Sequence, residues 1–213
     1  MTRVKVCGVT RPADAEMAVD LGASAIGVVT WRGSPRVVAL DQARDIARAL
    51  PPFVVLVGVF VNAPADEVRR WCEHVPLAAV QLHGDEGPSL AASLPRPVIK
   101  AVRLTPTTVD VVAEVWPGEV TLLVDTDDRA RRGGTGRVAD WALAARLARR
   151  RRSILAGGLT AGNVAEAIRS VQPWALDVAS GVEASPGIKD AGRMRAFFEA
   201  VRVASAGPRT ENG

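Results

Sequence analysis

Cysteine is scarce in this sequence, and its scarcity excludes several classes of protein. Only two cysteines, Cys7 and Cys72, occur among 213 residues, and they lie far apart in the chain. They provide neither a disulfide framework nor the spacing of a metal site. We therefore expect a protein of the reducing cytoplasm that holds no metal.

Long apolar runs are missing as well. None reaches the ~20 residues that a membrane-spanning helix needs, and the chain begins directly with a predicted strand instead of a signal peptide. We expect no membrane association. The net charge of +4 comes mostly from arginine and suits either an anionic small substrate or a nucleic acid. Because no aromatic residues interleave with the basic ones, we expect no nucleic-acid partner.

What the sequence does contain is a regular alternation of short apolar segments with amphipathic ones. The predicted strands are Val4–Val9, Ala25–Thr30, Phe53–Val61, Ala78–Leu82, Val98–Leu104, Val120–Thr126, Ser153–Leu159 and Ala175–Ala179. The predicted helices are Arg11–Leu21, Leu40–Leu50, Ala65–His74, Pro88–Leu94, Thr107–Trp116, Asp140–Arg150, Ala161–Val171 and Ala191–Val203. The strands are rich in valine and almost continuously apolar, as in a parallel sheet buried on both faces.

Eight strand–helix units without an internal linker favour a closed barrel over an open, doubly wound sheet. A six-stranded open sheet would leave two of the units without a place. We therefore predict an α/β fold with a single (β/α)8 (TIM) barrel over residues 1–204. The remaining residues, 205–213, are small and polar, and we expect them to form a disordered tail.

Small residues follow the last two predicted strands, at the end of the barrel where such folds carry their chemistry. Gly157-Gly158 ends one strand and Ser180-Gly181 ends the next. Backbone N–H groups freed at such turns suit a phosphate, although the glycines could also simply make tight turns. The loop with Gly133, Gly134 and Gly136 follows the preceding strand. It is either a third wall of this phosphate cradle or a mobile lid.

Two candidate proton-transfer groups stand at strand ends. Cys7 closes the first predicted strand, where it is either a small apolar filler or a base or nucleophile. Asp125 closes the sixth, and a partly desolvated carboxyl there suits a general acid. The alternative for Asp125 is a helix cap or a salt bridge with a loop arginine. Its position favours the acid.

Other charged residues have plainer explanations beside the functional ones. Arg36 follows Pro35 on a loop near the mouth and could bind a carboxylate with two parallel hydrogen bonds. His83 could be catalytic, but we favour a hydrogen-bonding role in the mouth and count it with the substrate-binding residues. Strand alternation places Lys5 inside the barrel, where Asp177 could neutralise it in a structural pair. We expect the run of arginines at 149–152 to end a helix and stay solvated.

From about Val4 to Phe198, the chain resembles the phosphoribosylanthranilate isomerases of tryptophan biosynthesis. The resemblance rests on a set of motifs and on their order along the chain. The motifs are Lys5-Val-Cys-Gly-Val-Thr-Arg, Gly33-Ser-Pro-Arg, Val57-Gly-Val-Phe, Gln81-Leu-His-Gly, Val124-Asp, Gly133-Gly-Thr-Gly, Ala156-Gly-Gly-Leu and the segment Asp177–Asp190. The chain departs from the family pattern at Trp31, Thr126 and Ala179, which leaves the candidate acid, base and arginine in place.

The resemblance implies a (β/α)8 barrel and a cofactor-free Amadori rearrangement of N-(5-phosphoribosyl)anthranilate to 1-(2-carboxyphenylamino)-1-deoxyribulose 5-phosphate. It implies that Asp125 is the general acid and Cys7 the general base. Arg36 would hold the anthranilate carboxylate. The phosphate would lie on backbone N–H groups near Gly134, Gly158 and Gly181.

Two other functions stay open at this point. The sister isomerase of histidine biosynthesis, or an enzyme that performs both reactions, would act on a substrate with a phosphate at each end. It would need a second glycine cradle after the third and fourth strands, and the sequence offers none there. An inactive barrel that serves as a basic binding module is the more remote alternative. The sequence does not decide the oligomeric state, and a monomer stays among the options.

Overall fold

Strands and helices alternate along the chain in the computed structural model, which describes residues 2–125 and 141–206. The strands of the sheet are β1 (Arg3–Cys7), β2 (Ala25–Val29), β3 (Val55–Phe60), β4 (Ala79–Leu82), β5 (Val98–Val102), β6 (Thr121–Asp125), β7 (Ser153–Ala156) and β8 (Ala175–Val178). The helices are α1 (Pro12–Asp20), α2 (Leu40–Arg48), α3 (Ala65–His74), α4 (Pro88–Ser93), α5 (Val109–Val115), α6 (Trp141–Ala148), α7 (Val164–Val171) and α8 (Ala191–Ser205). Every predicted strand and helix is present.

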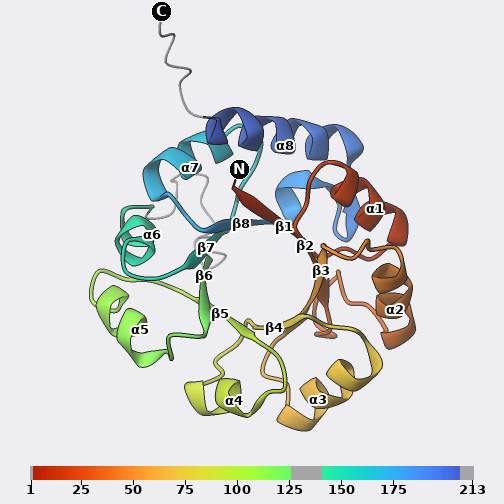
Figure 1. Ribbon diagram of the computed structural model, residues 1–213, viewed down its shortest axis with the longest axis horizontal. Helices are drawn as coiled ribbons and strands as arrows, with labels where there is room; N and C mark the ends of the chain where they lie inside the picture. Colours follow the sequence, from red (N-terminus) through yellow and green to blue (C-terminus); the bar gives the residue numbers. More distant parts are fainter. Residues whose placement is uncertain (1, 126–140, 207–213) are drawn as a thin grey trace, which may run out of the picture.

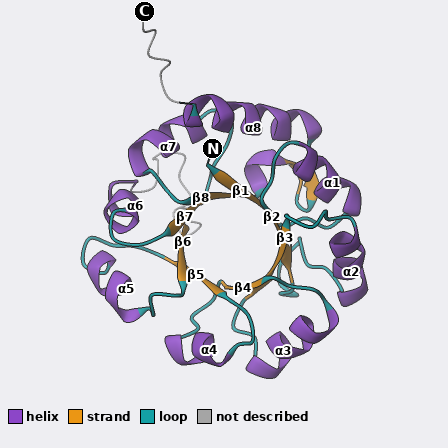
Figure 2. Cartoon of the chain, in the orientation of Figure 1, coloured by secondary structure: helices purple, strands orange, loops and turns teal. Residues whose placement is uncertain are grey.

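The eight strands close into a parallel barrel in which each strand pairs with the next and β8 pairs with β1. Figure 1 shows the ring of strands inside a ring of helices, and Figure 2 shows the loops that join them. The register at the closure places Lys5 beside Asp177, and on the other side of β1 it places Cys7 beside Gly27. The predicted (β/α)8 barrel is confirmed.

Alternation along each strand divides the core into two parts. Residues such as Ile26, Phe60 and Leu122 point outward and pack against the helices in the larger apolar cluster. Inward-pointing residues fill the barrel in layers. One layer holds Leu123 and Ile154 with small neighbours, and another, nearer the mouth, holds Cys7, Val29 and Val59. The barrel interior is therefore a packed core that becomes polar only toward one end.

A short antiparallel hairpin between β8 and α8 was not predicted. It consists of β9 (Glu183–Ser185) and β10 (Ile188–Lys189), and a single 3-10 turn, η1 (Ser180–Val182), connects it to β8. Asp190 then caps α8 by accepting a hydrogen bond of 2.8 Å from the backbone N–H of Arg193. The hairpin folds back over the end of β1, where it contributes two charged residues to the site described below.

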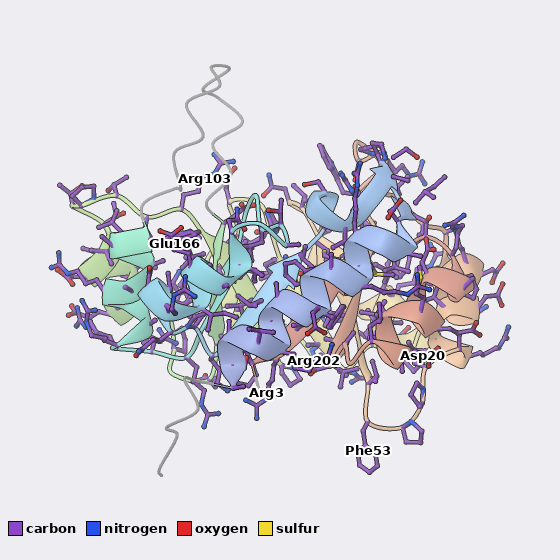
Figure 3. All side chains as sticks on the ribbon, turned by 90° about the horizontal axis from the view of Figure 1, so that it is seen from above. Arg3, Asp20, Phe53, Arg103, Glu166 and Arg202 are labelled. Carbon is purple, nitrogen blue, oxygen red and sulfur yellow. The ribbon has the colours of Figure 1, made fainter. Side chains whose placement is uncertain are left out.

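The ends of the predicted elements agree with the observed ones to within three residues. Phe53, predicted to start a strand, is instead fully exposed in the turn before β3. Pro51 and Pro52 form this turn, and Figure 3 shows Phe53 at the end of the barrel away from Arg103. The helix α8 extends to Ser205, one residue beyond the predicted domain boundary, and the rest of the predicted tail from residue 207 lies outside the described residues. Among the helices of the described ranges, none combines the length and apolarity needed to cross a membrane.

Candidate active site

A cavity of about 360 Å³ opens at the C-terminal ends of the barrel strands. Arg103, at the end of β5, marks this side of the molecule in Figure 3. The predicted site residues that line the cavity are Cys7, Arg36, His83, Asp125, Gly157, Gly158, Ser180 and Gly181. Residues that are far apart in the sequence thus meet at one mouth, as the barrel fold predicts. Gly133, Gly134 and Gly136 lie outside the described residues.

Cys7 sits at the last position of β1, buried against Val29, Val59 and Ala179. Burial raises the pKa of its thiol, and the negative charge of Asp177 raises it further, while the positive charge of Lys5 lowers it. Lys5 itself is buried and pairs with Asp177, as predicted. The thiol therefore faces the cavity directly above a buried ion pair.

Asp125 ends β6 and is half-buried at the mouth. His83 lies beside it, with 3.1 Å between the imidazole Nε2 and the carboxylate Oδ2 of Asp125. The other ring nitrogen, Nδ1, is 2.9 Å from the side-chain amide Nε2 of Gln81, which points into the barrel one layer below. The histidine thus bridges the candidate acid and a fully buried amide. The expectation that His83 hydrogen-bonds within the mouth is confirmed, while its contact with a substrate stays a prediction.

Arg36 reaches the mouth from the loop after β2, and its backbone N–H donates to the Ser34 hydroxyl. Its guanidinium donates two hydrogen bonds to Glu183 on β9, Nε to Oε1 at 2.8 Å and Nη2 to Oε2 at 2.5 Å. Burial alone would raise the pKa of Glu183, but hydrogen bonds from Arg36 and Lys189 hold it below its ordinary value. The arginine is therefore a fixed side chain, as a carboxylate-binding group requires.

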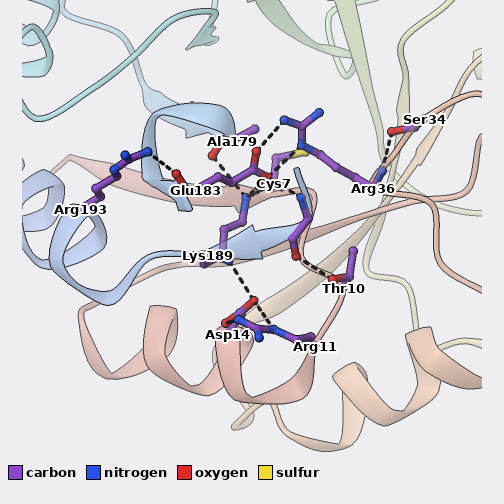
Figure 4. A network of polar contacts seen from close by, with 11 residues as sticks. Cys7, Thr10, Arg11, Asp14, Ser34, Arg36, Ala179, Glu183, Lys189 and Arg193 are labelled. Atoms are coloured by element: carbon purple, nitrogen blue, oxygen red, sulfur yellow. Dashed lines mark hydrogen bonds and ion pairs between the residues drawn. The ribbon is translucent and has the colours of Figure 1, made fainter. Parts of the chain in front are cut away.

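Lys189 on β10 is the centre of the polar network that Figure 4 shows. Its buried ammonium donates to the Glu183 carboxylate at 2.9 Å and to the backbone carbonyls of Cys7 at 2.6 Å and Ala179 at 3.3 Å. The hairpin, the end of β8 and the end of β1 are tied together at this one nitrogen. Neither Glu183 nor Lys189 was predicted from the sequence as a site residue. The only available signal was that both fall in the segment from Asp177 to Asp190.

The glycine turns after β7 and β8 lie against each other. Gly157 and Gly158 have φ values of 89° and 62°, which side chains other than glycine rarely adopt. A Cβ atom on Gly181 would overlap the carbonyl oxygen of Leu159, so the two turns approach too closely for any larger residue. Ser180 and Gly181 form the 3-10 turn after β8. This part of the cavity wall is backbone, and backbone N–H groups at such turns can bind a phosphate group.

Within residues 2–125 and 141–206, no group of three or more His, Cys, Asp or Glu side chains could hold a metal ion. The side chains described above can donate and accept protons and bind anions. The arrangement therefore supports acid–base chemistry on a small anionic molecule.

A family model and the most similar relatives of this chain carry the same description. A family model described as PRAI, N-(5'phosphoribosyl)anthranilate (PRA) isomerase, matches residues 4–200. A relative from Pseudomonas paraeruginosa (strain DSM 24068 / PA7), named N-(5'-phosphoribosyl)anthranilate isomerase, is 49 % identical over 203 residues. These residues cover 94 % of this chain and 95 % of the relative.

Solved structures agree with the sequence comparison. The crystal structure of phosphoribosyl anthranilate isomerase from Thermotoga maritima is 39 % identical, with a TM-score of 0.88, over 95 % of this chain and 100 % of that one. A second crystal structure holds such an isomerase in complex with reduced 1-(o-carboxyphenylamino)-1-deoxyribulose 5-phosphate. It is 38 % identical, with a TM-score of 0.85, over 95 % of this chain and 100 % of that one.

Proposed function

Because this chain belongs to the N-(5'-phosphoribosyl)anthranilate isomerase family of tryptophan biosynthesis, we propose that Cys7 and Asp125 perform the isomerisation at the barrel mouth. One observation carries the proposal. A thiol on β1 and a carboxyl on β6 line the same cavity, and this cavity has a fixed arginine and a wall of glycine turns. This combination provides a base, an acid and sites for two anionic groups of one substrate.

The reaction begins at Asp125. Its carboxyl group gives a proton to the ring oxygen of the sugar, the bond between this oxygen and C1′ breaks, and an iminium ion forms. The iminium makes the C2′ proton acidic, so a thiolate of modest basicity can remove it. Cys7 takes this proton and leaves an enolamine, which tautomerises to the ketone. Atoms and electrons balance without any cofactor, as in an internal redox isomerisation.

Anion binding at two points holds the sugar between acid and base. Arg36 binds the anthranilate carboxylate with the N–H groups that Glu183 does not use. The phosphate is placed on the backbone N–H groups near Gly158 and Gly181, together with Gly134 outside the described residues. Fixing both ends of the substrate brings the reacting atoms into one geometry. The complex of the similar enzyme with a reduced phosphorylated compound supports a phosphorylated small molecule as the ligand.

We also infer that the enzyme works in the cytoplasm. Both cysteines are free thiols in the structure, Cys7 at the mouth and Cys72 in α3. A free thiol as the base requires a compartment that keeps it reduced.

The test is a steady-state assay of phosphoribosylanthranilate turnover with three variants. Cys7→Ser and Asp125→Asn each remove one proton-transfer group, so we expect kcat to fall by about 10²- to 10⁴-fold. Cys72→Ala is the matched control, because this cysteine is buried among the helices away from the cavity. Its kcat should stay within about twofold of the wild type. Full turnover by Cys7→Ser would remove the thiol from the mechanism. Assaying the histidine-pathway substrate in parallel separates this activity from the sister reaction.

A further inference from the structure

A buried ion pair lies inside the barrel just below Cys7. The ammonium of Lys5 on β1 is 3.0 Å from each carboxylate oxygen of Asp177 on β8. Both side chains are almost completely enclosed. Such a pair contributes little net stability, because the cost of removing two charges from water offsets their attraction. A role beyond stability would explain why two charges are placed at this point inside the barrel.

The lysine side chain extends toward the layer that contains the thiol. Gly27 is the neighbour of Cys7 on β2, and a Cβ atom placed on it would be 2.9 Å from the Cys7 sulfur and 3.0 Å from the Lys5 nitrogen. Sulfur and ammonium nitrogen thus both lie within about 3 Å of the point that a side chain at this position would occupy. Gly27 leaves room for the two groups to approach. An ammonium has three donors, and the Asp177 oxygens use two, which leaves one for a further acceptor.

The charges around Cys7 do not cancel while the thiol is neutral. The charged groups that face it are Lys5, Arg36 and Lys189 as cations, and Asp177 and Glu183 as anions. Arg36 and Lys189 share the single carboxylate of Glu183, whereas Asp177 neutralises Lys5. These five side chains together therefore carry one positive charge in excess. Asp125 and Arg103 line the same cavity from β6 and from the end of β5. Asp125, in the protonated state in which the proposed reaction begins, adds no charge, and Arg103 is exposed, so water screens its charge. A thiolate at Cys7 completes the balance.

We propose that Lys5 is a positioning residue for Cys7 and that its ammonium is the counter-ion of the Cys7 thiolate. Asp177 binds this ammonium, and the missing side chain of Gly27 leaves room for it beside the sulfur. This inference rests on the proposed function, in which that thiolate is the base. Lys5 keeps its own proton throughout, and the proton that Cys7 removes from the substrate ends on sulfur. Burial and Asp177 raise the pKa of Cys7, and the positive charge of Lys5 is the strongest influence that lowers it.

The experiment measures the pH dependence of Cys7 alkylation by iodoacetamide, because only the thiolate reacts. A Cys72→Ala background leaves a single thiol. Replacing Lys5 by methionine removes the cation, so we expect the alkylation midpoint to rise by about 1 to 3 pH units. Replacing Asp177 by asparagine removes an anion, so the midpoint should fall. A purely structural role of the pair would not move the two midpoints in opposite directions.

Two further variants keep the inference testable if Lys5→Met does not fold. Lys5→Met leaves the Asp177 charge alone in the barrel and could prevent folding, whereas Lys5→Met/Asp177→Asn contains no buried charge at this point. Its midpoint should lie above that of Asp177→Asn alone. Gly27→Ala keeps both charges but adds a methyl group that would press on both the Lys5 nitrogen and the Cys7 sulfur, and it should raise the midpoint by a smaller amount.

Equal midpoints in Asp177→Asn and the double variant would overturn the inference, and so would shifts of the same sign in the two single variants. Alkylation needs no substrate, so this result is independent of turnover. Full turnover by Cys7→Ser, together with a Lys5-dependent midpoint, would overturn the proposed function but leave the lysine as the counter-ion of the thiolate.

Discussion

Gln81 is the one side chain in the barrel interior with a polar atom that has no hydrogen-bond partner in the described part of the chain. Its Oε1 is buried and unpaired, while its Nε2 donates toward the Nδ1 atom of His83. With the amide in this orientation, His83 carries its proton on Nε2 and donates a hydrogen bond to Asp125. If the amide were rotated, the Gln81 Oε1 would accept a hydrogen bond from the His83 Nδ1–H, and the His83 Nε2 would accept one from a protonated Asp125. The second arrangement suits a carboxyl that must act as an acid.

This assignment predicts different results for two substitutions of Gln81. Methionine cannot hydrogen-bond the imidazole, and losing one such bond of about 1 kcal/mol corresponds to a roughly fivefold lower kcat. Glutamate can still accept from Nδ1–H, so Gln81→Glu should retain more of the wild-type kcat than Gln81→Met. Steady-state kinetics of both variants would check this. A Gln81→Met enzyme with the kcat of the wild type would show that the amide does not act through His83.

Sequence alone was sufficient for residues whose position follows from strand alternation. Cys7 and Asp125 were placed at the mouth because each ends a predicted barrel strand, and the Lys5–Asp177 pair was predicted because side chains two apart on a strand share a face. Glu183 was not predicted as the partner of Arg36. The two residues are 147 positions apart, and they meet only because a short hairpin folds back over the mouth. No periodic pattern encodes that contact.

At the scale of elements, the run of arginines after α6 behaves differently from the solvated helix end that was predicted. Arg151 donates four hydrogen bonds to the backbone carbonyls of Ala113, Trp116, Pro117 and Val120. Burial lowers the pKa of its guanidinium. These carbonyls belong to the end of α5 and to its connection to β6. Arg151 therefore fixes the approach to the strand that carries Asp125.

Replacing Arg151 by methionine should destabilise the protein markedly, because four carbonyls lose a charged donor. Hydrogen bonds to a charged group contribute about 1.5–3 kcal/mol, so we expect a loss of roughly 3 kcal/mol. For a chain of this length that corresponds to a fall in Tm of about 6–12 °C. Calorimetry of Arg151→Met would measure it. Arg149→Met is the matched control, since Arg149 is exposed, and its Tm should change by less than about 2 °C. Equal shifts in the two variants would contradict the assignment.

Element boundaries show where sequence patterns stop being informative. The eight strand–helix units were predicted because each has its own apolar period and turn. The hairpin β9–β10 was missed because strands of three and two residues are too short to show alternation. Phe53 was placed in a strand because its apolar side chain continues the pattern of β3. The two prolines before it instead form a turn, and the strand begins only at Val55.

For the whole molecule, two buried carboxylates, Glu86 in the loop between β4 and α4 and Glu183 on β9, link stability to pH. Glu86 accepts hydrogen bonds from the Lys100 ammonium at 2.7 Å and from the backbone N–H groups of Asn62 and Gly84. Burial alone would raise the pKa of Glu86, but these donors hold it below its ordinary value. Glu183 is held below its ordinary value in the same way by Arg36 and Lys189. Both carboxylates hold segments together at the mouth, so their protonation weakens the hydrogen bonds and ion pairs that position the site residues.

The sign of the pH effect follows from the direction of these shifts. The unfolded chain binds protons on these glutamates at about pH 4.3, whereas the folded chain binds them only at lower pH. Their contribution to stability is therefore complete above about pH 4.3 and is lost as the pH falls through the folded pKa values. We expect the urea midpoint to fall steeply below about pH 4. Urea unfolding between pH 3 and pH 7 would measure it.

A variant of Glu86 separates this effect from general acid unfolding. In Glu86→Gln the Lys100 ammonium loses its charged partner, so stability at pH 7 should fall by about 2 kcal/mol. The decrease below pH 4 should then be shallower than in the wild type, because one of the groups that bind protons on unfolding is missing. Glu67→Gln, which changes an exposed carboxylate on α3, should keep the wild-type slope. If the urea midpoint of Glu86→Gln fell with decreasing pH as steeply as that of the wild type, other groups would be responsible for the loss of stability below pH 4. The Lys100–Glu86 pair would then not couple the stability of the fold to pH.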